Sequence, residues 1–283
     1  YDKTTKMVLL NHIDDLTLVG PESSTTNFMK LVEQKVLIKT GDVEHPGSSA
    51  SFLKTTKLRA SDSLITIPYV GHIDKIIEIA GVAGSKSVST PGEKMKEDVD
   101  NEVPLSDEQA TQFRSGIGIA IYLSMWRPDI QYAVKEGARC MSTPTEGGWK
   151  RLKRLARYLI GTRDLAFRMK ASHVPDAIDV YCDSDWGGCS HGTMRSTSGV
   201  LVSVGGMIVT SISSTQPGLP SLSSAEAELR AVCKGAVEGL YVQDIMKFID
   251  WNLPLRLYTD SSAGKAATQR LGVGKMRHLD IQY

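Results

Sequence analysis

Two short apolar runs separated by polar residues open the chain. They lie in residues 7–20 (MVLLNHIDDLTLVG), and this pattern is typical of a β-hairpin with Asp14 and Asp15 at its tip. Residues 24–38 then carry apolar side chains at the spacing of a helix. The sequence therefore predicts a hairpin followed by a helix.

The next part of the chain mixes strands with one helix and ends in a polar stretch. The composition of residues 41–50 indicates a loop, and a strand pair and a helix over residues 73–82 are expected to follow it. Gly81 and Gly84 suit the end of that helix. Residues 84–107 hold Ser, Pro, Gly and many charges but few large apolar residues, so we expect an extended linker and a first boundary there.

The middle of the chain has the spacing of helices. Residues 109–170 are mainly helical by pattern, with a break at residues 126–128 (WRP). Residues 142–145 (STPT) are a helix-start signal with a proline ahead of the helical run. A second boundary is expected at residues 171–176.

From residue 177 onward, strands come first and helices later. Residues 177–186 alternate with period 2, which indicates a half-buried strand. Gly205-Gly206 lies between two β-rich runs and predicts a tight hairpin. A long helix over residues 223–249, a strand over 255–260 and a helix opening at a Ser cap complete the order β-β-β-α-β-α.

Composition and charge narrow the class of protein. Among the 283 residues, 41% are hydrophobic and 23% charged, which excludes a wholly disordered chain and a coiled coil. The 33 Lys+Arg and 32 Asp+Glu give a net charge of +1, so a basic face could only be local. No membrane span or signal peptide is expected. The four cysteines without a CxxC pair favour reduced thiols in the cytoplasm or nucleus, and the absence of an initial Met suggests a fragment.

Four acidic residues lie at the ends of the predicted C-terminal elements. Asp183 ends the first strand, Glu228 lies in the first turns of the long helix, Asp260 ends the fourth strand, and Asp280 lies near the chain end. If the strands of Asp183 and Asp260 are adjacent and parallel, both carboxylates fall at the same edge of the sheet. As alternatives, Asp183 could be a turn residue and Asp260 a helix cap.

Clustered carboxylates repel one another, and a divalent metal removes that repulsion. Ligation by oxygen alone favours Mg²⁺ or Mn²⁺. Within the helix start, Ser223 and Glu226 fit a capping box, so we favour Glu228 for chemistry. The small residues Ala231 and Gly235 are expected to leave room for a metal or phosphate.

A basic helix is predicted before the second boundary. Trp149 and the leucines that follow it fall on one face, and the other face carries a basic group comprising Lys150, Arg151, Lys153, Arg154 and Arg157. This basic group is either an ordinary solvated face or a ridge that contacts phosphates.

Short segments in a fixed order resemble copia-type LTR retrotransposon polyproteins. The resemblance to the ribonuclease H domain of that family lies in YCDSDWGG, RSTSGVLV, SLSSAEAEL, LYTDSSA and RHLDIQY. The segment between polymerase and ribonuclease H is similar to LSMWRPDIQYAV, MSTPTEGGWKRLKRLARYLIGTRDL and GSKSVSTPG. HIDDLTLVG resembles the YVDD motif of the polymerase.

The resemblance implies three parts in an α/β architecture. Residues 1–90 would be a reverse transcriptase C-terminal remnant of partial palm and thumb (α+β), with Asp14 and Asp15 as polymerase metal ligands. Residues 91–175 would be a mainly helical connection. Residues 176–283 would be a ribonuclease H-like domain, with a mixed five-stranded sheet flanked by helices and truncated at its last helix.

The activity implied is hydrolysis of RNA in an RNA–DNA hybrid by two metal ions, Mg²⁺ or Mn²⁺. The family's catalytic and metal-binding acids correspond to Asp183, Glu228, Asp260 and Asp280, with Asp185 a competitor for the first place. The implied partners are the hybrid and the remainder of the polyprotein, with no membrane. The alternative is an inactive nucleic-acid-binding relic, and the chain alone is not expected to polymerise.

Overall fold

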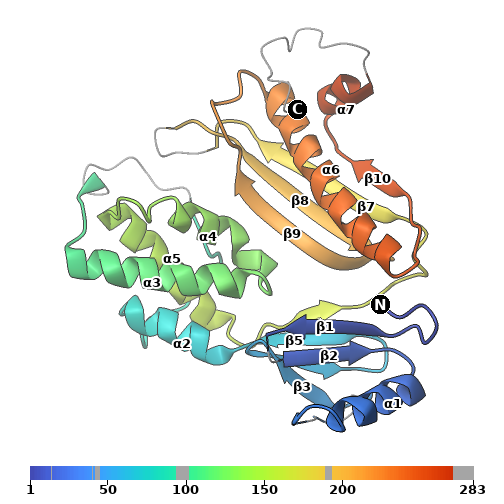
Figure 1. Ribbon diagram of the computed structural model, residues 1–283. Helices are drawn as coiled ribbons and strands as arrows, with labels where there is room; N and C mark the ends of the chain where they lie inside the picture. Colours follow the sequence, from blue (N-terminus) through green and yellow to red (C-terminus); the bar gives the residue numbers. More distant parts are fainter. Residues whose placement is uncertain (14, 40, 42–44, 94–101, 189–192, 270–283) are drawn as a thin grey trace.

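The computed structural model describes residues 1–13, 15–39, 41, 45–93, 102–188 and 193–269. Figure 1 shows a helical group beside a small N-terminal sheet region, with a larger C-terminal sheet above them. The described part of the chain is therefore mixed α/β, as the sequence predicts.

The N-terminal region contains a hairpin, a helix and a four-stranded sheet. The hairpin pairs two antiparallel strands in register from Val8↔Val19 to His12↔Asp15, which confirms the prediction for residues 7–20. The sheet has the strand order β3-β4-β5-β6, and all its pairs are antiparallel. The elements are β1 (Val8–His12), β2 (Asp15–Val19), α1 (Glu22–Glu33), β3 (Ser49–Phe52), β4 (Thr55–Arg59), β5 (Leu64–Pro68) and β6 (Phe167–Met169).

Two of these elements differ from the sequence prediction. The predicted strand pair is a run of three strands, with β3 beginning inside the stretch assigned to a loop. Strand β6 lies in the stretch expected to be helical, and it pairs with β5 from Leu64↔Met169 to Thr66↔Phe167. A strand of three residues is too short to show the period-2 alternation by which strands are recognised in a sequence. Strand β6 forms because β5, which is distant in the sequence, pairs with it.

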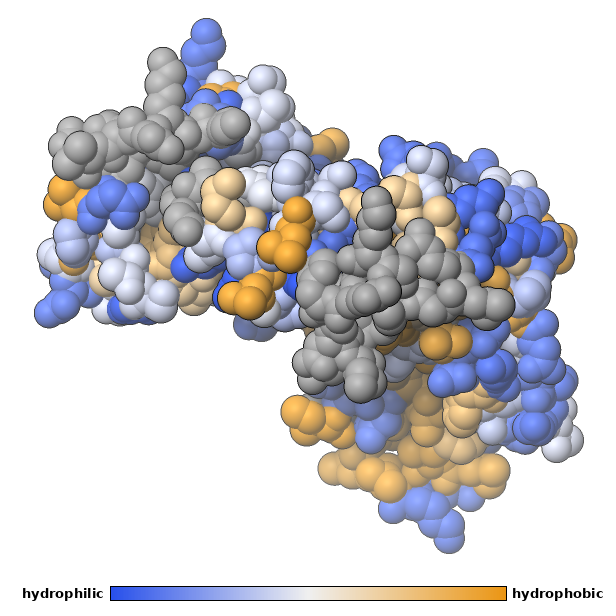
Figure 2. Space-filling model, turned by 90° about the horizontal axis from the view of Figure 1, so that it is seen from above, coloured by the Kyte–Doolittle hydropathy of each residue, from blue (hydrophilic) through white to orange (hydrophobic). Residues whose placement is uncertain are grey.

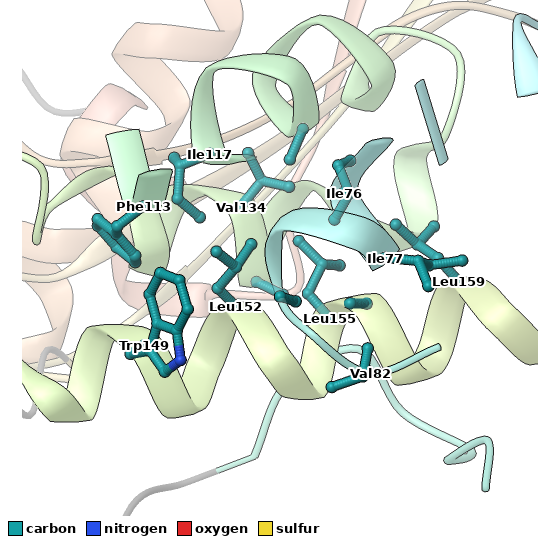
Figure 3. Packing of buried hydrophobic residues seen from close by; sticks show 14 of the residues in the cluster. Ile76, Ile77, Val82, Phe113, Ile117, Val134, Trp149, Leu152, Leu155 and Leu159 are labelled. Atoms are coloured by element: carbon teal, nitrogen blue, oxygen red, sulfur yellow. The ribbon is translucent and has the colours of Figure 1, made fainter. Parts of the chain in front are cut away.

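The helical group forms one hydrophobic core. Its members are α2 (Val70–Ile79), α3 (Asp107–Ser124), the 3₁₀ turn η2 (Pro128–Ile130), α4 (Gln131–Ala138) and α5 (Glu146–Gly161). Figure 3 shows Ile76 and Ile77 from α2 close to Leu155 and Leu159 from α5, all buried in the same cluster. The core therefore runs across the boundary expected at residue 90.

A glycine ends α2, as the sequence predicts. Gly81 has a φ of 64°, in the left-handed region that favours glycine. Its N–H donates to the Glu78 carbonyl at 3.0 Å, and the Val82 N–H donates to the Ile77 carbonyl at 3.3 Å. This pair of bonds is the Schellman motif, and it turns the buried Val82 back into the helical core.

Residues 85–93, the described first part of the predicted linker, are irregular in structure and lie against α5. The Arg157 Nε donates to the Lys86 carbonyl at 2.8 Å, and Arg154 Nη2 donates to Thr90 Oγ1 at 2.8 Å. Glu93 forms an ion pair with Arg154 at 2.7 Å. These contacts fix the strap, defined as residues 85–93, along the basic helix.

The C-terminal sheet has the order β10-β7-β8-β9. Strands β7, β8 and β9 form an antiparallel meander, and β10 is parallel to β7. The resemblance implies five strands, and the described residues supply four of them. The elements are β7 (Ile178–Asp185), β8 (Thr197–Val204), β9 (Met207–Thr215), α6 (Ser224–Phe248), β10 (Leu255–Tyr258) and α7 (Ser262–Gln269), which confirms the order β-β-β-α-β-α.

The turn between β8 and β9 consists of the two predicted glycines. Gly205 and Gly206 have φ values of 59° and 77°, and positive φ at both central positions is the requirement of the tight turn that matches strand twist. The helix caps also follow the sequence, because the side chains of Ser223 and Ser261 accept hydrogen bonds from the Glu226 and Gly264 N–H groups at 3.2 and 3.0 Å.

A line of small residues lets α6 approach the sheet closely. Ala227, Ala231, Gly235 and Gly239 are all buried at intervals of four. A Cβ at Gly235 would lie 2.1 Å from the Cys182 sulfur. The space beside Ala231 and Gly235, expected to admit a metal or phosphate, is therefore occupied by the sheet, and that expectation was wrong.

The Gly235→Ala substitution should destabilise the protein by about 1–3 kcal/mol, because the added methyl overlaps the Cys182 sulfur in a packed core. Thermal unfolding measures the effect. The matched control is Gly118→Ala in α3, where a Cβ would meet nothing within 4 Å. That change should stabilise by about 0.5–1 kcal/mol. Equal effects at both sites would contradict this account of the helix–sheet contact.

Helix α4 joins the helical group to the C-terminal sheet. Lys135 Nζ donates to Thr197 Oγ1 at 2.6 Å, and Gln131 Nε2 donates to the Ser211 carbonyl at 2.9 Å. Lys135 also pairs with Glu136 at 2.7 Å, and both side chains are only 9% exposed. The two hydrogen bonds hold α4 against β8 and β9, and the buried ion pair lies within α4 at this contact.

Hydrophilic side chains cover most of the surface in Figure 2, and apolar ones gather in separate patches. Some of the exposed apolar side chains belong to the outward side of α6, namely Val237, Leu240, Tyr241, Ile245 and Phe248. Within the described ranges, no helix has the length and apolar character needed to cross a membrane.

Candidate metal centre

Three of the predicted acids come together at one edge of the C-terminal sheet. Asp183, Glu228 and Asp260 each offer a carboxylate oxygen, and these atoms all lie within 4.8 Å of one another. Asp183 and Asp260 are exposed, and Glu228 is half-buried. We call these residues the acidic triad.

The sheet register explains why two members of the acidic triad meet. Strands β7 and β10 run parallel, and Tyr181 is paired with Tyr258. Asp183 lies two residues after Tyr181 near the end of β7, and Asp260 lies two residues after Tyr258, just beyond the end of β10. Because the two strands are adjacent and parallel, both carboxylates fall at the same edge of the sheet.

Helix α6 supplies Glu228, the third member of the acidic triad. Glu226, two residues earlier, is used in capping the helix instead. Glu226 is buried, with Oε2 accepting from the Leu222 N–H at 2.9 Å and Oε1 paired with Arg230 at 2.7 Å. This is the capping role predicted for Glu226, with its acceptor bond made one residue before the cap. Glu228 is directed instead to the acidic triad.

The electrostatics of Glu228 fit a cation site. Burial raises the pKa of the Glu228 carboxyl, and the nearby Asp183 and Asp260 raise it further, against contacts with Ser184 that lower it. Its Oε2 atom is buried and has no hydrogen-bond partner among the described residues. An ion between the carboxylates would supply the missing partner and cancel their repulsion. The acidic triad can therefore hold a metal ion.

Asp185, the competitor of Asp183, points elsewhere. Its Oδ1 accepts a hydrogen bond from the Thr197 N–H. A Cβ on Gly188 would lie 2.0 Å from Asp185 Oδ2, so the loop after β7 passes very close to this carboxylate. The geometry thus brings Asp183, and not Asp185, beside Glu228 and Asp260.

The remaining predicted acids are not brought to the acidic triad by any described contact. Asp280 and Asp14 lie outside the described residues. Asp15 is exposed and begins β2, opposite His12 in the N-terminal hairpin. Its role in a polymerase metal pair stays a prediction.

The predicted basic group divides into two kinds of side chain. Lys150 and Lys153 are exposed, whereas the three arginines are half-buried. Arg154 and Arg157 bind the strap, and Arg151 Nη1 lies 3.8 Å from the Cys140 sulfur. The helix therefore keeps a basic surface while two of its arginines also hold the chain together.

A pair of tyrosines beside the acidic triad is absent from the sequence prediction. The rings of Tyr181 and Tyr258 stack with centroids 4.9 Å apart and planes at 14°. They are 48% and 43% exposed. The alternation of residues along β7 places Tyr181 on the same face as Asp183, so Tyr181 could have been predicted from the sequence. Tyr258 could not, because its position beside Tyr181 depends on the pairing of β10 with β7.

The Glu228→Gln substitution should slightly stabilise the metal-free protein at pH 7. Because the folded-state pKa of Glu228 is raised, the folded protein holds this proton more strongly than the unfolded chain does. The contribution of Glu228 to stability therefore falls as pH rises above its unfolded pKa. Gln carries no charge and so has no such pH-dependent loss of stability. The increase in the free energy of unfolding should stay below about 1 kcal/mol, because solvent screens the carboxylate.

The test is thermal unfolding of both proteins at pH 3 and pH 7, with and without Mg²⁺. The gain of Glu228→Gln should vanish at pH 3, where the native group is protonated as well. Mg²⁺ should stabilise the native protein more than the variant, because an ion that binds only the folded state stabilises it. A variant that is less stable than the native protein at pH 7 without metal would contradict this prediction.

No protein-family model matches the chain. Among curated proteins, it is 33% identical over 235 residues to the uncharacterized mitochondrial protein AtMg00810 of Arabidopsis thaliana, covering 82% of this chain and 92% of that protein. It is 31% identical over 176 residues to the retrovirus-related Pol polyprotein from transposon RE2 of the same plant, covering 61% of this chain and 12% of the polyprotein.

The similarity to a second Arabidopsis thaliana polyprotein extends over almost the whole chain. The retrovirus-related Pol polyprotein from transposon RE1 is 27% identical over 280 residues, which is 97% of this chain and 18% of the polyprotein. The chain thus spans less than a fifth of the length of these two polyproteins.

Proposed function

Since the chain belongs to the family of copia-type retrotransposon Pol polyproteins, we propose that it contains a ribonuclease H-type endonuclease. Its substrate would be the RNA strand of an RNA–DNA hybrid. The observation that carries this proposal is the acidic triad, whose three carboxylates converge at the edge where a parallel strand pair ends.

The topology of the C-terminal sheet supports the proposal. An antiparallel meander followed by a helix and a parallel strand is the arrangement expected of a ribonuclease H-like domain, and the described elements have this order. The acids lie where β7 ends, where α6 begins and just after β10. These are the places that the resemblance implies for Asp183, Glu228 and Asp260.

The acidic triad would hold Mg²⁺ or Mn²⁺, since its donors are all carboxylate oxygens. A metal pair there would supply a water activated at neutral pH and stabilisation of the leaving oxygen. The residues of the chain contribute position and charge. Asp183 is held by the strand pairing of β7, Asp260 follows two residues after the last paired residue of β10, and Glu228 must lose its proton to bind a cation, which its raised pKa opposes.

The other parts of the chain would support substrate binding. We propose residues 1–90 as a reverse transcriptase remnant without polymerase activity of its own, 91–175 as the connection, and 176–283 as the nuclease domain. The basic group on α5 would contact the phosphates of the hybrid. The remainder of the polyprotein would be a second partner, in a cytoplasmic or nuclear setting.

The decisive experiment incubates the purified chain with a hybrid labelled on its RNA strand. Cleavage should require added Mg²⁺ or Mn²⁺ and should stop with a chelator, while RNA–RNA and DNA–DNA duplexes of the same sequence stay intact. Binding without cleavage at any metal concentration would instead indicate an inactive nucleic-acid-binding relic.

A further inference from the structure

A second candidate site lies between the helical group and the C-terminal sheet. It is a pocket of about 590 Å³ bounded by the strap, α4, α5 and the end of β7. Pockets of roughly 300–1,000 Å³ are the usual size for small-molecule and cofactor sites. The side chains that define its chemistry are Glu93, Tyr132, Glu136, Lys150, Arg151, Arg154 and Asp185.

The pocket carries both signs of charge and an aromatic ring. Lys150, Arg151 and Arg154 are cationic, and Arg154 retains a buried Nε that has no hydrogen-bond partner in the described part of the chain. Glu93, Glu136 and Asp185 offer carboxylate oxygens, which accept hydrogen bonds from N–H groups, and Glu93 is already paired with Arg154 at 2.7 Å. Tyr132 is 48% exposed and presents an apolar surface.

This combination selects the ligand by chemistry. A small inorganic anion would meet the carboxylates as well as the cations, and a purely apolar ligand would cover charged groups without offering them a hydrogen bond. A nucleotide matches each part, with its phosphate facing the cations, its flat base against the exposed part of Tyr132, whose ring also has Lys135 Nζ 4.4 Å from its centroid, and exocyclic N–H donors toward the carboxylates.

The position of the pocket relates it to the acidic triad. Asp185 lines the pocket and follows Asp183 by two residues on the same strand. Two residues of strand span about 7 Å, which is close to the spacing of neighbouring phosphates along a nucleic-acid strand. A strand that reaches the acidic triad could therefore continue into the pocket.

We propose that the pocket binds one unpaired nucleotide of a strand whose duplex part lies over the acidic triad. This inference rests on the proposed function for the place of the duplex. It adds a preference for substrates with a single-stranded overhang, and it assigns Tyr132 and Lys150 to the recognition of that overhang.

The test measures binding of labelled RNA–DNA hybrids by the full chain without divalent metal. A hybrid with a short single-stranded overhang should bind at least about 5-fold more tightly than a blunt hybrid of the same duplex, since stacking one base on an aromatic ring commonly contributes that much. Tyr132→Ala should remove the preference, and Lys150→Gln should reduce it.

Lys153→Gln is the matched control, because Lys153 is exposed on the same helix and does not line the pocket. It should weaken blunt and overhang hybrids alike and leave their ratio unchanged. Adenosine 5′-monophosphate should compete for the overhang, and inorganic phosphate at the same concentration should compete less. Circular dichroism should show folded variants, since the altered side chains are half-exposed or exposed.

Equal affinity for the two hybrids would overturn the proposal, as would equal changes of the ratio in Lys150→Gln and Lys153→Gln. Inorganic phosphate competing as well as the nucleotide would also overturn it. The proposed function fails separately, because a preference for overhangs without any metal-dependent cleavage would keep the pocket and remove the nuclease.

Discussion

Asp183→Asn should lower metal-dependent cleavage of an RNA–DNA hybrid by at least about 100-fold while leaving the fold intact. Asparagine keeps the size of the side chain but removes the charge from the acidic triad, where three carboxylates lie within 4.8 Å. A bound metal contributes several kcal/mol to such reactions, and each 1.4 kcal/mol is a factor of ten in rate. The exposed position of Asp183 makes a loss of stability small.

Cleavage rates over a range of Mg²⁺ concentrations, together with thermal unfolding, check this expectation. Asp244→Asn is the matched control, since Asp244 is 77% exposed on α6 and outside the acidic triad. Glu226→Gln is unsuitable as a control, because Glu226 is buried against Arg230 and its loss would reduce stability. If Asp183→Asn retained full activity and Asp185→Asn lost it, the choice between these two residues would be wrong.

Arg127→Ala should destabilise the protein by about 3 kcal/mol. The Arg127 side chain is 2% exposed and donates to both carboxylate oxygens of Asp129, at 2.9 and 2.7 Å. It also donates to the carbonyl and the hydroxyl of Thr162, at 3.0 and 2.9 Å. Removing one member of a buried ion pair leaves the other uncompensated, and Asp129, at 32% exposure, keeps some contact with solvent.

Urea unfolding of the variant measures the loss. Arg127→Lys should recover only part of it, because an ammonium group cannot reproduce the two parallel bonds to the carboxylate. The control is Arg163→Ala, which removes an ion pair with Asp74 whose side chains are 44% and 49% exposed. Its effect should stay below about 1 kcal/mol. Similar losses at both arginines would show that burial of Arg127 adds nothing.

Features determined by neighbouring residues could be predicted from the sequence. The turn at Gly205 and Gly206 needs only two positive φ angles, and the caps at Ser223 and Ser261 need a hydroxyl ahead of a helical run. The acids of the triad were found because each ends a strand or begins a helix. Their meeting at one edge required the parallel pairing of β7 and β10, which the sequence left as a condition and the structure supplies.

Features determined by distant contacts could not be predicted in this way. Arg127 stands between helices, where a charged residue is normally expected at the surface, and its burial depends on Thr162, 35 residues away, as well as on the nearby Asp129. The polar composition of the strap predicts an extended linker, but Arg154 and Arg157 hold the strap against α5 through hydrogen bonds. The pairing of Tyr258 with Tyr181 likewise depends on the sheet.

Strand β6 has a consequence for how this chain can be divided. The three residues Phe167–Met169 cover the edge of β5 with a ladder from Leu64 to Thr66. A shortened chain that stops before β6 would expose unpaired N–H and C=O groups along that edge, beside the apolar Leu64. Such an edge is a template for pairing with another copy. Shortened chains ending before residue 167 should therefore self-associate in solution, whereas those extending past residue 170 keep the edge closed.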